Sequence, residues 1–223
     1  RTLWASIAAD RKSIVFERDM SVWKIDLASG KAGQVAITLR GAPASPEPTL
    51  VRVRDGYSNL ALSPDNKKLV VIARGDVFAA SAKDGGNASR VTFTPAPESA
   101  VVWSADSKSV IYCSSESGFR QLVQYTFASQ QFKILTKAPA NHDQPTISPN
   151  GKFIAYVRDG KELRTIELST GQDKLMTKAF FGARIGSSSI EWSPDNQYIA
   201  YSAYGKKSFC NIFIVSAQGG MPR

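Results

Sequence analysis

Ser63-Pro64-Asp65-Asn66-Lys67, with the apolar run 69–72 close behind it, is the stretch that decides the fold. Proline at the second position fixes φ, aspartate bonds to nearby backbone, and asparagine at the fourth position tolerates left-handed backbone. The pattern therefore predicts a tight hairpin turn that leads into a β-strand. Related pentapeptides occur at 8–12, 104–108, 148–152 and 193–197.

The five copies are regularly spaced along the chain. Their acidic or amide position falls at 10, 65, 106, 150 and 195, with intervals of 55, 41, 44 and 45 residues. Repeats of about 40–50 residues are typical of β-propeller blades. The first interval is longer because it holds an insertion over 42–57. Arg11 and Ser107 stand at the fourth position of their copies and suit left-handed backbone poorly, so we expect these two turns to be distorted.

The segment after each turn is apolar without alternation, at 14–16, 69–72, 110–113, 153–157 and 198–201. A half-exposed strand alternates with period two, so these runs indicate strands covered on both faces. A propeller blade lies between two neighbours, which cover both of its faces. A parallel α/β sheet would do the same, but it needs helices between its strands, and no segment shows a convincing 3.6-residue period.

Each unit continues with a third strand, and the first four also have a fourth strand that ends on an apolar residue and threonine. The sequence thus predicts an all-β fold, a β-propeller with four-stranded antiparallel blades, present as a partial arc of about five. One segment is expected to span 1–223, with an incomplete last unit and predicted blades at 1–41, 58–95, 99–138, 143–178 and 187–223.

Composition limits the classes of partner. Hydrophobic residues make up 43% of the 223 residues, enough for a core, and the formal net charge is +9. No run approaches the roughly 18 apolar residues of a membrane span, and the N-terminus has no secretory apolar segment. Lysine and arginine are spread over turns rather than clustered with aromatic residues, so we expect neither a membrane span nor a nucleic-acid partner.

Catalytic chemistry is not predicted for this chain. The sequence has no G-x-S-x-G elbow, no H-E-x-x-H pair and no G-x-x-x-x-G-K-[ST] loop. With a single histidine and two cysteines, it cannot form a Cys/His zinc cluster. We therefore assign no catalytic residue, metal site or cofactor. Cys113 and Cys210 are expected to be buried free thiols.

The candidate binding residues follow from position in the repeat. Asn59, Ser99, Asp143 and Ser189 each come just before, or at the start of, an expected first strand, so they are predicted to lie near the mouth of a central channel. His142 lies in the same kind of connection. Two interpretations remain open for it, an exposed loop histidine or a ligand contact at the channel mouth.

The inserted segment 42–57 contains two closely spaced arginines. Residues 49–54 alternate and predict an extra edge strand with Arg52 and Arg54 on its outer side. Two guanidinium groups on one face could hold the C-terminal carboxylate of a peptide by bidentate contacts. A solvated basic face is the alternative interpretation.

The repeats also resemble a known family. Ser-Pro-Asp-x-Lys followed by an apolar strand is similar to the propeller repeats of TolB-like proteins. The stretches 62–78, 112–122 and 134–136 resemble more narrowly one propeller of tricorn protease and its bacterial relatives. This resemblance implies a non-catalytic module that gates or guides peptides through a central channel to a serine peptidase site in another part of a larger polypeptide.

The resemblance implies a peptide or protein partner, the rest of a larger polypeptide, and a full-length parent that is a serine peptidase. It also leaves two alternatives, a TolB-like periplasmic protein-binding scaffold and the propeller cap of a dipeptidyl-peptidase-type hydrolase. The implied location is the periplasm or cell envelope, with the cytoplasm as the alternative.

Overall fold

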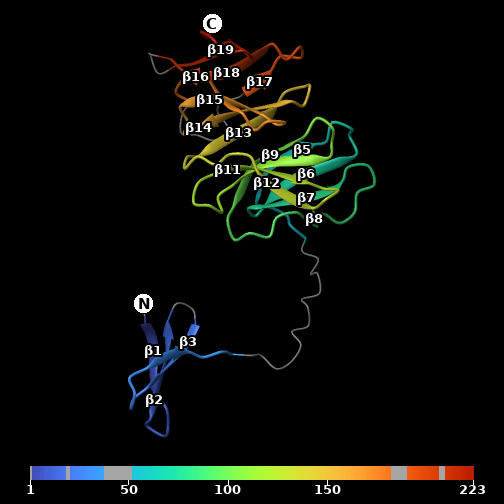
Figure 1. The fold of residues 1–223 in the computed structure, drawn as a ribbon. Helices are drawn as coiled ribbons and strands as arrows, with labels where there is room; N and C mark the ends of the chain where they lie inside the picture. Colours follow the sequence, from blue (N-terminus) through green and yellow to red (C-terminus); the bar gives the residue numbers. More distant parts are fainter. Residues whose placement is uncertain (1, 19–20, 38–51, 182–189, 206–208) are drawn as a thin grey trace. The chain divides into compact units, whose positions relative to one another are not determined.

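The computed structural model of the chain describes residues 2–18, 21–37, 52–181, 190–205 and 209–223. The chain divides into two compact units, residues 1–52 and 53–223. Throughout the described ranges every regular element is a β-strand, which confirms the all-β prediction (Figure 1). None of the described segments forms a helix long and apolar enough to cross a membrane. The assignment of 1–223 to a single segment stays a prediction.

Each sheet is an antiparallel meander in which the strands follow in chain order, and we call the sheets blades 1 to 5. The unit 1–52 holds blade 1, made of β1 (Thr2–Ile7), β2 (Ser13–Arg18), β3 (Ser21–Asp26) and β4 (Ala32–Gln34). The unit 53–223 holds the other four blades. Blade 2 is made of β5 (Tyr57–Leu62), β6 (Lys68–Ala73), β7 (Asp76–Ser81) and β8 (Ser89–Arg90).

Blades 3 and 4 have four strands each, and blade 5 has three in its described part. Blade 3 is made of β9 (Glu98–Trp103), β10 (Ser109–Ser114), β11 (Gln121–Thr126) and β12 (Gln131–Ile134). Blade 4 is made of β13 (His142–Ile147), β14 (Phe153–Arg158), β15 (Glu162–Glu167) and β16 (Asp173–Lys178). Blade 5 is made of β17 (Ile190–Trp192), β18 (Tyr198–Tyr204) and β19 (Cys210–Ser216).

The repeated pentapeptide closes the hairpin between the first and second strands. The Ser63 hydroxyl donates to Asp65 Oδ1 at 2.6 Å and accepts from the Lys68 amide at 2.9 Å, while Asp65 Oδ1 also accepts from the Lys67 amide at 3.0 Å. The same bonds recur in blades 3, 4 and 5.

The fourth position of the pentapeptide has left-handed backbone in all five copies, with φ between 56° and 70°. Arg11, at 56°, and Ser107, at 60°, follow the others. The expected distortion of these two turns is therefore wrong. The hydrogen bonds around the preceding acid hold the turn, so a residue with poor left-handed preference is forced into the common geometry.

Second strands are buried on both faces where a blade has two neighbours. In β10, Val110 and Tyr112 pack into the core shared with blade 2, while Ile111 and Cys113 pack into the core shared with blade 4. In β14, Ile154 and Tyr156 pack into the core shared with blade 3, while Ala155 and Val157 pack into the core shared with blade 5. This explains why these runs do not alternate in sequence. The predicted stacking is confirmed for blades 2 to 5.

Blade 5 shows the contrast. Its β18 and β19 bury Ile199 and Val215 against blade 4, whereas Ile212 on the other face is 79% exposed. Cys210 lies at the start of β19 and is exposed, so its predicted burial is wrong, while Cys113 is buried as expected. Arg223 exchanges two backbone hydrogen bonds of 2.9 Å with Ile214 of β19.

Candidate functional site

The first strands of successive blades in the unit 53–223 lie against one another, β5 with β9, β9 with β13, and β13 with β17. They form an inner row. Asn59, Ser99 and Asp143 pair with Ile72, Cys113 and Val157 on the neighbouring second strands, which are equivalent positions of the repeat. The structure therefore places three of the predicted residues alike along this row. Ser189, the fourth, lies outside the described residues, and a ligand role for all four stays a prediction.

Asn59 links blade 2 to blade 3. Its Oδ1 accepts a hydrogen bond of 3.0 Å from the Val101 amide. Val101 belongs to a bulge in β9, where Ala100 has a φ of 50° and the ladder skips one position. A bulge leaves an amide unpaired within its own sheet. Asn59 satisfies this amide, while the residue as a whole remains exposed.

Asp143 links blade 4 to blade 3 through Arg120. Its two carboxylate oxygens accept from Arg120 Nε at 2.5 Å and Nη2 at 2.8 Å. The hydrogen bonds to Asp143 raise the pKa of the Arg120 guanidinium above its usual value. The Arg120 side chain is 32% exposed and that of Asp143 14%, so the guanidinium is the more open of the two groups. Bidentate geometry fixes its orientation at the edge of the inner row.

His142 is buried, with 1% of its surface exposed. Its ring lies 5.4 Å from that of Tyr156, and Nδ1 donates to the Arg120 carbonyl at 2.9 Å, since a carbonyl oxygen can only accept. Burial lowers the pKa of the imidazole below its usual value. The interpretation of His142 as an exposed loop residue is therefore wrong, and its role as a ligand contact stays a prediction. Its ring fills the seam between blades 3 and 4.

Arg52 and Arg54 are both exposed. Residues 52–54 form no strand, so the predicted edge strand is wrong over its described part, and 49–51 lie outside the described residues. Arg52 ends one compact unit and Arg54 belongs to the other. A carboxylate-binding role for the two arginines stays a prediction.

Glu98 is a buried carboxyl that no motif in the sequence singles out. It is 4% exposed and accepts hydrogen bonds from Thr94 Oγ1 at 2.8 Å and Thr92 Oγ1 at 3.2 Å. Burial raises the pKa of this carboxyl, and the two threonine hydroxyls partly oppose that rise. Thr92 closes the fourth strand of blade 2, because its Oγ1 also accepts from the Val77 amide at 2.9 Å.

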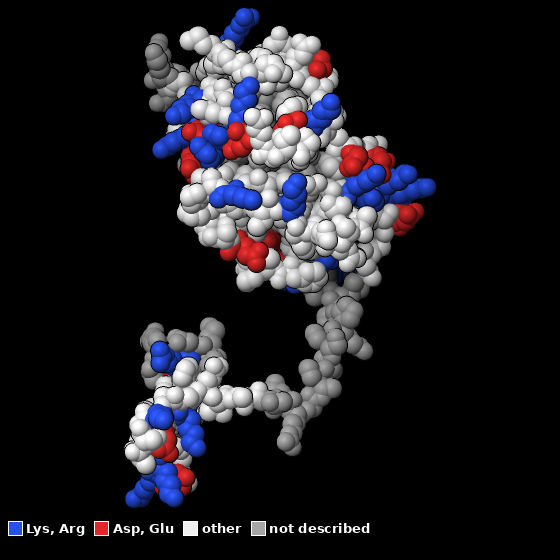
Figure 2. Space-filling view, viewed as in Figure 1, with Lys and Arg blue, Asp and Glu red and all other residues white. Residues whose placement is uncertain are grey.

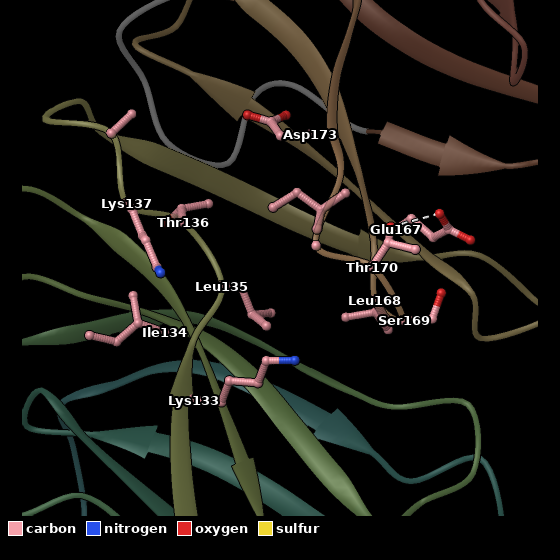
Figure 3. Close-up of a pocket in the computed structure, with 13 residues that line it drawn as sticks. Lys133, Ile134, Leu135, Thr136, Lys137, Glu167, Leu168, Ser169, Thr170 and Asp173 are labelled. Atoms are coloured by element: carbon pink, nitrogen blue, oxygen red, sulfur yellow. Dashed lines mark hydrogen bonds between the residues drawn. The ribbon is translucent and has the colours of Figure 1, made fainter.

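A cleft in the described part lies away from the inner row. A cleft of about 510 Å³ separates the outer strand of blade 3 from the β15–β16 turn of blade 4 (Figure 3). One wall is the segment 133–138 and the other is formed by 166–171 and Asp173. Volumes of this order are typical of ligand pockets. None of the predicted site residues lines it.

Charge is dispersed over the surface. Lysine and arginine are scattered across the visible face of residues 53–223, with aspartate and glutamate among them (Figure 2). Among the described residues, no group of three histidine, cysteine, aspartate or glutamate side chains is placed to hold a metal ion.

Comparison with known proteins supports the fold. No family model and no curated protein matches the sequence. TolB from Acinetobacter baumannii superimposes with a TM-score of 0.58 at 18% identity, over 100% of this chain and 56% of that one. A Mycobacterium tuberculosis puromycin-hydrolyzing peptidase gives 0.64 at 14% identity, over 100% and 37%. Tricorn protease gives 0.57 at 15% identity, over 96% and 20%.

At these identities the comparisons show a common fold. The fold is that of a β-propeller. The predicted likeness to TolB-like and tricorn propellers is confirmed at the level of fold. The chain spans just over half the length of the TolB from A. baumannii that it matches.

Besides the burial of Glu98, two features of this fold were not predicted from the sequence. Arg120 lies in the polar connection between the second and third strands of blade 3, and its partner Asp143 is in another blade. Nothing in the local sequence of Arg120 marks that contact. The outer cleft is lined by segments about 30 residues apart in the chain, and neither segment by itself indicates that the other lies opposite.

Proposed function

We propose that this chain is a non-catalytic propeller module of a larger tricorn-like serine peptidase, and that it guides peptide substrates along the row of first strands. The likeness of the blades to tricorn protease and to a mycobacterial peptidase supports the proposal, since both are much longer than the matched part. The observation that carries it is the repeated polar position at the start of β5, β9 and β13, occupied by Asn59, Ser99 and Asp143.

The proposed mechanism involves no bond breaking. Polar groups at equivalent positions of adjacent blades offer weak, repeated contacts to the backbone of an extended peptide, and the row limits which chains enter. The charge of the Arg120 guanidinium is balanced by Asp143, which also holds it in place, so in this mechanism it offers positioned N–H donors to the carbonyl groups of the peptide.

A crosslinking experiment tests peptide binding at the inner row. A photoreactive amino acid replaces Ser58, which is exposed and adjacent to Asn59, and in a matched control replaces Lys83, which is exposed in the β7–β8 loop. The chain is then irradiated with an unstructured 20-residue peptide. We expect crosslinking from position 58 and little from position 83. Equal yields at both positions would contradict binding at the row.

A deletion tests the role in the parent protein. Removal of residues 53–223 is expected to leave cleavage of short fluorogenic peptides measurable and to change the rate and pattern for long peptides. Long-peptide kinetics identical to those of the intact enzyme would contradict guiding.

Two other functions have support of their own. Complete coverage of this chain by TolB favours a TolB-like protein-binding scaffold in the cell envelope. The TM-score of 0.64 with the puromycin-hydrolyzing peptidase favours the propeller cap of a dipeptidyl-peptidase-type hydrolase. The coding sequence beyond residue 223 separates the three: a tricorn-like peptidase domain, an early stop after the remaining blades, or a domain with a G-x-S-x-G elbow.

A further inference from the structure

The outer cleft between blades 3 and 4 combines an apolar floor with open positive charge. Ile166 is 1% exposed, and Leu135 and Leu168 are half-buried against the core that the two blades share. Lys133 and Lys137 are exposed along one wall. Within residues 52–181, neither ammonium group has a carboxylate partner.

The carboxylates of the opposite wall already have partners. Glu167 Oε2 accepts from the Thr170 hydroxyl at 2.8 Å, a bond drawn in Figure 3. Asp173 accepts from Arg164 Nε at 3.0 and 3.2 Å. Glu167 keeps its negative charge, because the Thr170 hydroxyl is neutral, whereas the charge of Asp173 is balanced by Arg164. The wall formed by residues 133–138 carries only the cationic groups of Lys133 and Lys137, so this wall favours an anionic occupant.

One face of the β12 segment presents a regular pattern to blade 4. Residues two apart on an extended strand share a face, so Lys133, Leu135 and Lys137 line up, with Leu135 between the lysines. Leu135 packs into the core shared with blade 4, which fixes the direction of this face. Lys133 and Leu135 extend toward Leu168 and Ser169 (Figure 3). The two lysines are separated by about 13 Å of strand.

The edge of β12 is open. In the described part β12 pairs with β11 on one side and with no strand on the other. The Leu135 amide donates to the Leu122 carbonyl at 2.8 Å, toward β11. Backbone groups alternate along an antiparallel strand, so the N–H and C=O of Ile134 point the other way, out of the sheet. An open edge of this kind can accept an extended chain as an added strand.

We propose that this cleft binds an extended acidic segment of a partner protein. The segment adds as a strand to the open edge of β12. It places two side-chain carboxylates, four residues apart, against Lys133 and Lys137, and an apolar residue midway between them over Leu135. This site is separate from the inner row, and it does not depend on the proposed guiding of peptides.

Fluorescence anisotropy with the whole 223-residue chain tests the proposal. The probe is a fluorescein-labelled, C-terminally amidated peptide, Thr-Glu-Thr-Leu-Thr-Glu-Thr. We expect K133E/K137E to weaken its binding about tenfold or more. The matched control is K108E/K152E, which changes the net charge equally on exposed turns of the same two blades, and its affinity should stay within about twofold of wild type.

Two further arms sharpen the test. Ile134→Pro removes the outward amide without touching the bonds to β11 and should also weaken binding, with thermal unfolding showing that the variant is folded. A probe with lysines in place of its glutamates should bind K133E/K137E better than wild type.

The proposal is overturned if wild type does not bind the probe at about 1 mM protein. It is also overturned if both double variants weaken binding equally, or if a peptide whose one carboxylate is its free C-terminus binds as well as the probe.

Discussion

Replacement of Ile154 by alanine tests the feature on which the fold depends, the burial of a second strand on both faces. Ile154 is 0% exposed and packs with Ile111, Leu122 and Ile166 between blades 3 and 4. Loss of a buried isoleucine to alanine costs about 2–5 kcal/mol, because the surroundings fill the cavity incompletely. For a unit of this size the melting temperature should fall by roughly 5–15 °C.

The opposite face of the same strand supplies the second half of the test. Ala155 is 0% exposed and packs in the core shared with blade 5. A155L inserts three carbon atoms into that core and should cost about 1–3 kcal/mol. In a sheet with one free face, one of the two substitutions would be tolerated. The matched control is Ile212→Ala on the open face of blade 5, where Ile212 is 79% exposed and the cost should stay below about 0.5 kcal/mol.

Urea denaturation followed by tryptophan fluorescence measures these differences, with Trp103 and Trp192 as reporters at the inter-blade contacts. Trp103 Nε1 donates to the Ala61 carbonyl at 3.0 Å and Trp192 Nε1 to the Thr146 carbonyl at 3.3 Å, each across to the preceding blade. The reasoning is refuted if either Ile154→Ala or Ala155→Leu unfolds within about 0.5 kcal/mol of wild type.

Three other predictions concern individual contacts. Burial in the folded protein raises the pKa of Glu98 above its value in the unfolded chain, so the folded protein binds this proton more tightly. The free energy of unfolding is therefore expected to fall as the pH rises from about 4.5 through the pKa of the folded state. Glu98→Gln should flatten that slope in urea midpoints taken between pH 4 and 7, and an unchanged slope would contradict the assignment. A double-mutant cycle of Arg120→Met and Asp143→Asn should give a coupling of about 1 kcal/mol that shrinks in salt, whereas no coupling would show the pair to be incidental. Gly151→Ala should destabilise more than Gly171→Ala, since both have positive φ but an added Cβ at Gly151 meets Ala105 Cβ at 3.0 Å; equal melting temperatures would count against the clash.

The turn geometry could be predicted because its bonds join residues within five positions. Ser63, Asp65 and their counterparts make the same hydrogen bonds in each blade of the unit 53–223. The expected distortion at Arg11 and Ser107 failed because it rested on the preference of single residues. The hydrogen bonds of the turn outweigh the cost of left-handed backbone at these two residues.

Exposure could not be predicted equally well. His142 and Glu98 are the first residues of β13 and β9, next to polar connections that ordinarily face water, yet they are 1% and 4% exposed. What covers them comes from other strands, such as Tyr156 against His142 and Ser114 against Glu98. Cys210 shows the opposite error. Its place at the start of an apolar strand suggested burial, but it lies on the open face of blade 5 and is exposed.

The sequence by itself determined the repeat, the hairpin chemistry and the doubly apolar second strands, because these depend on groups near one another in the chain. The tertiary structure alone decided which polar groups are satisfied across a seam, such as Asn59 with Val101 and Asp143 with Arg120, and where a cleft remains. Those contacts join residues 23 to 42 positions apart, and no local pattern records which side chain a neighbouring blade will bring against them.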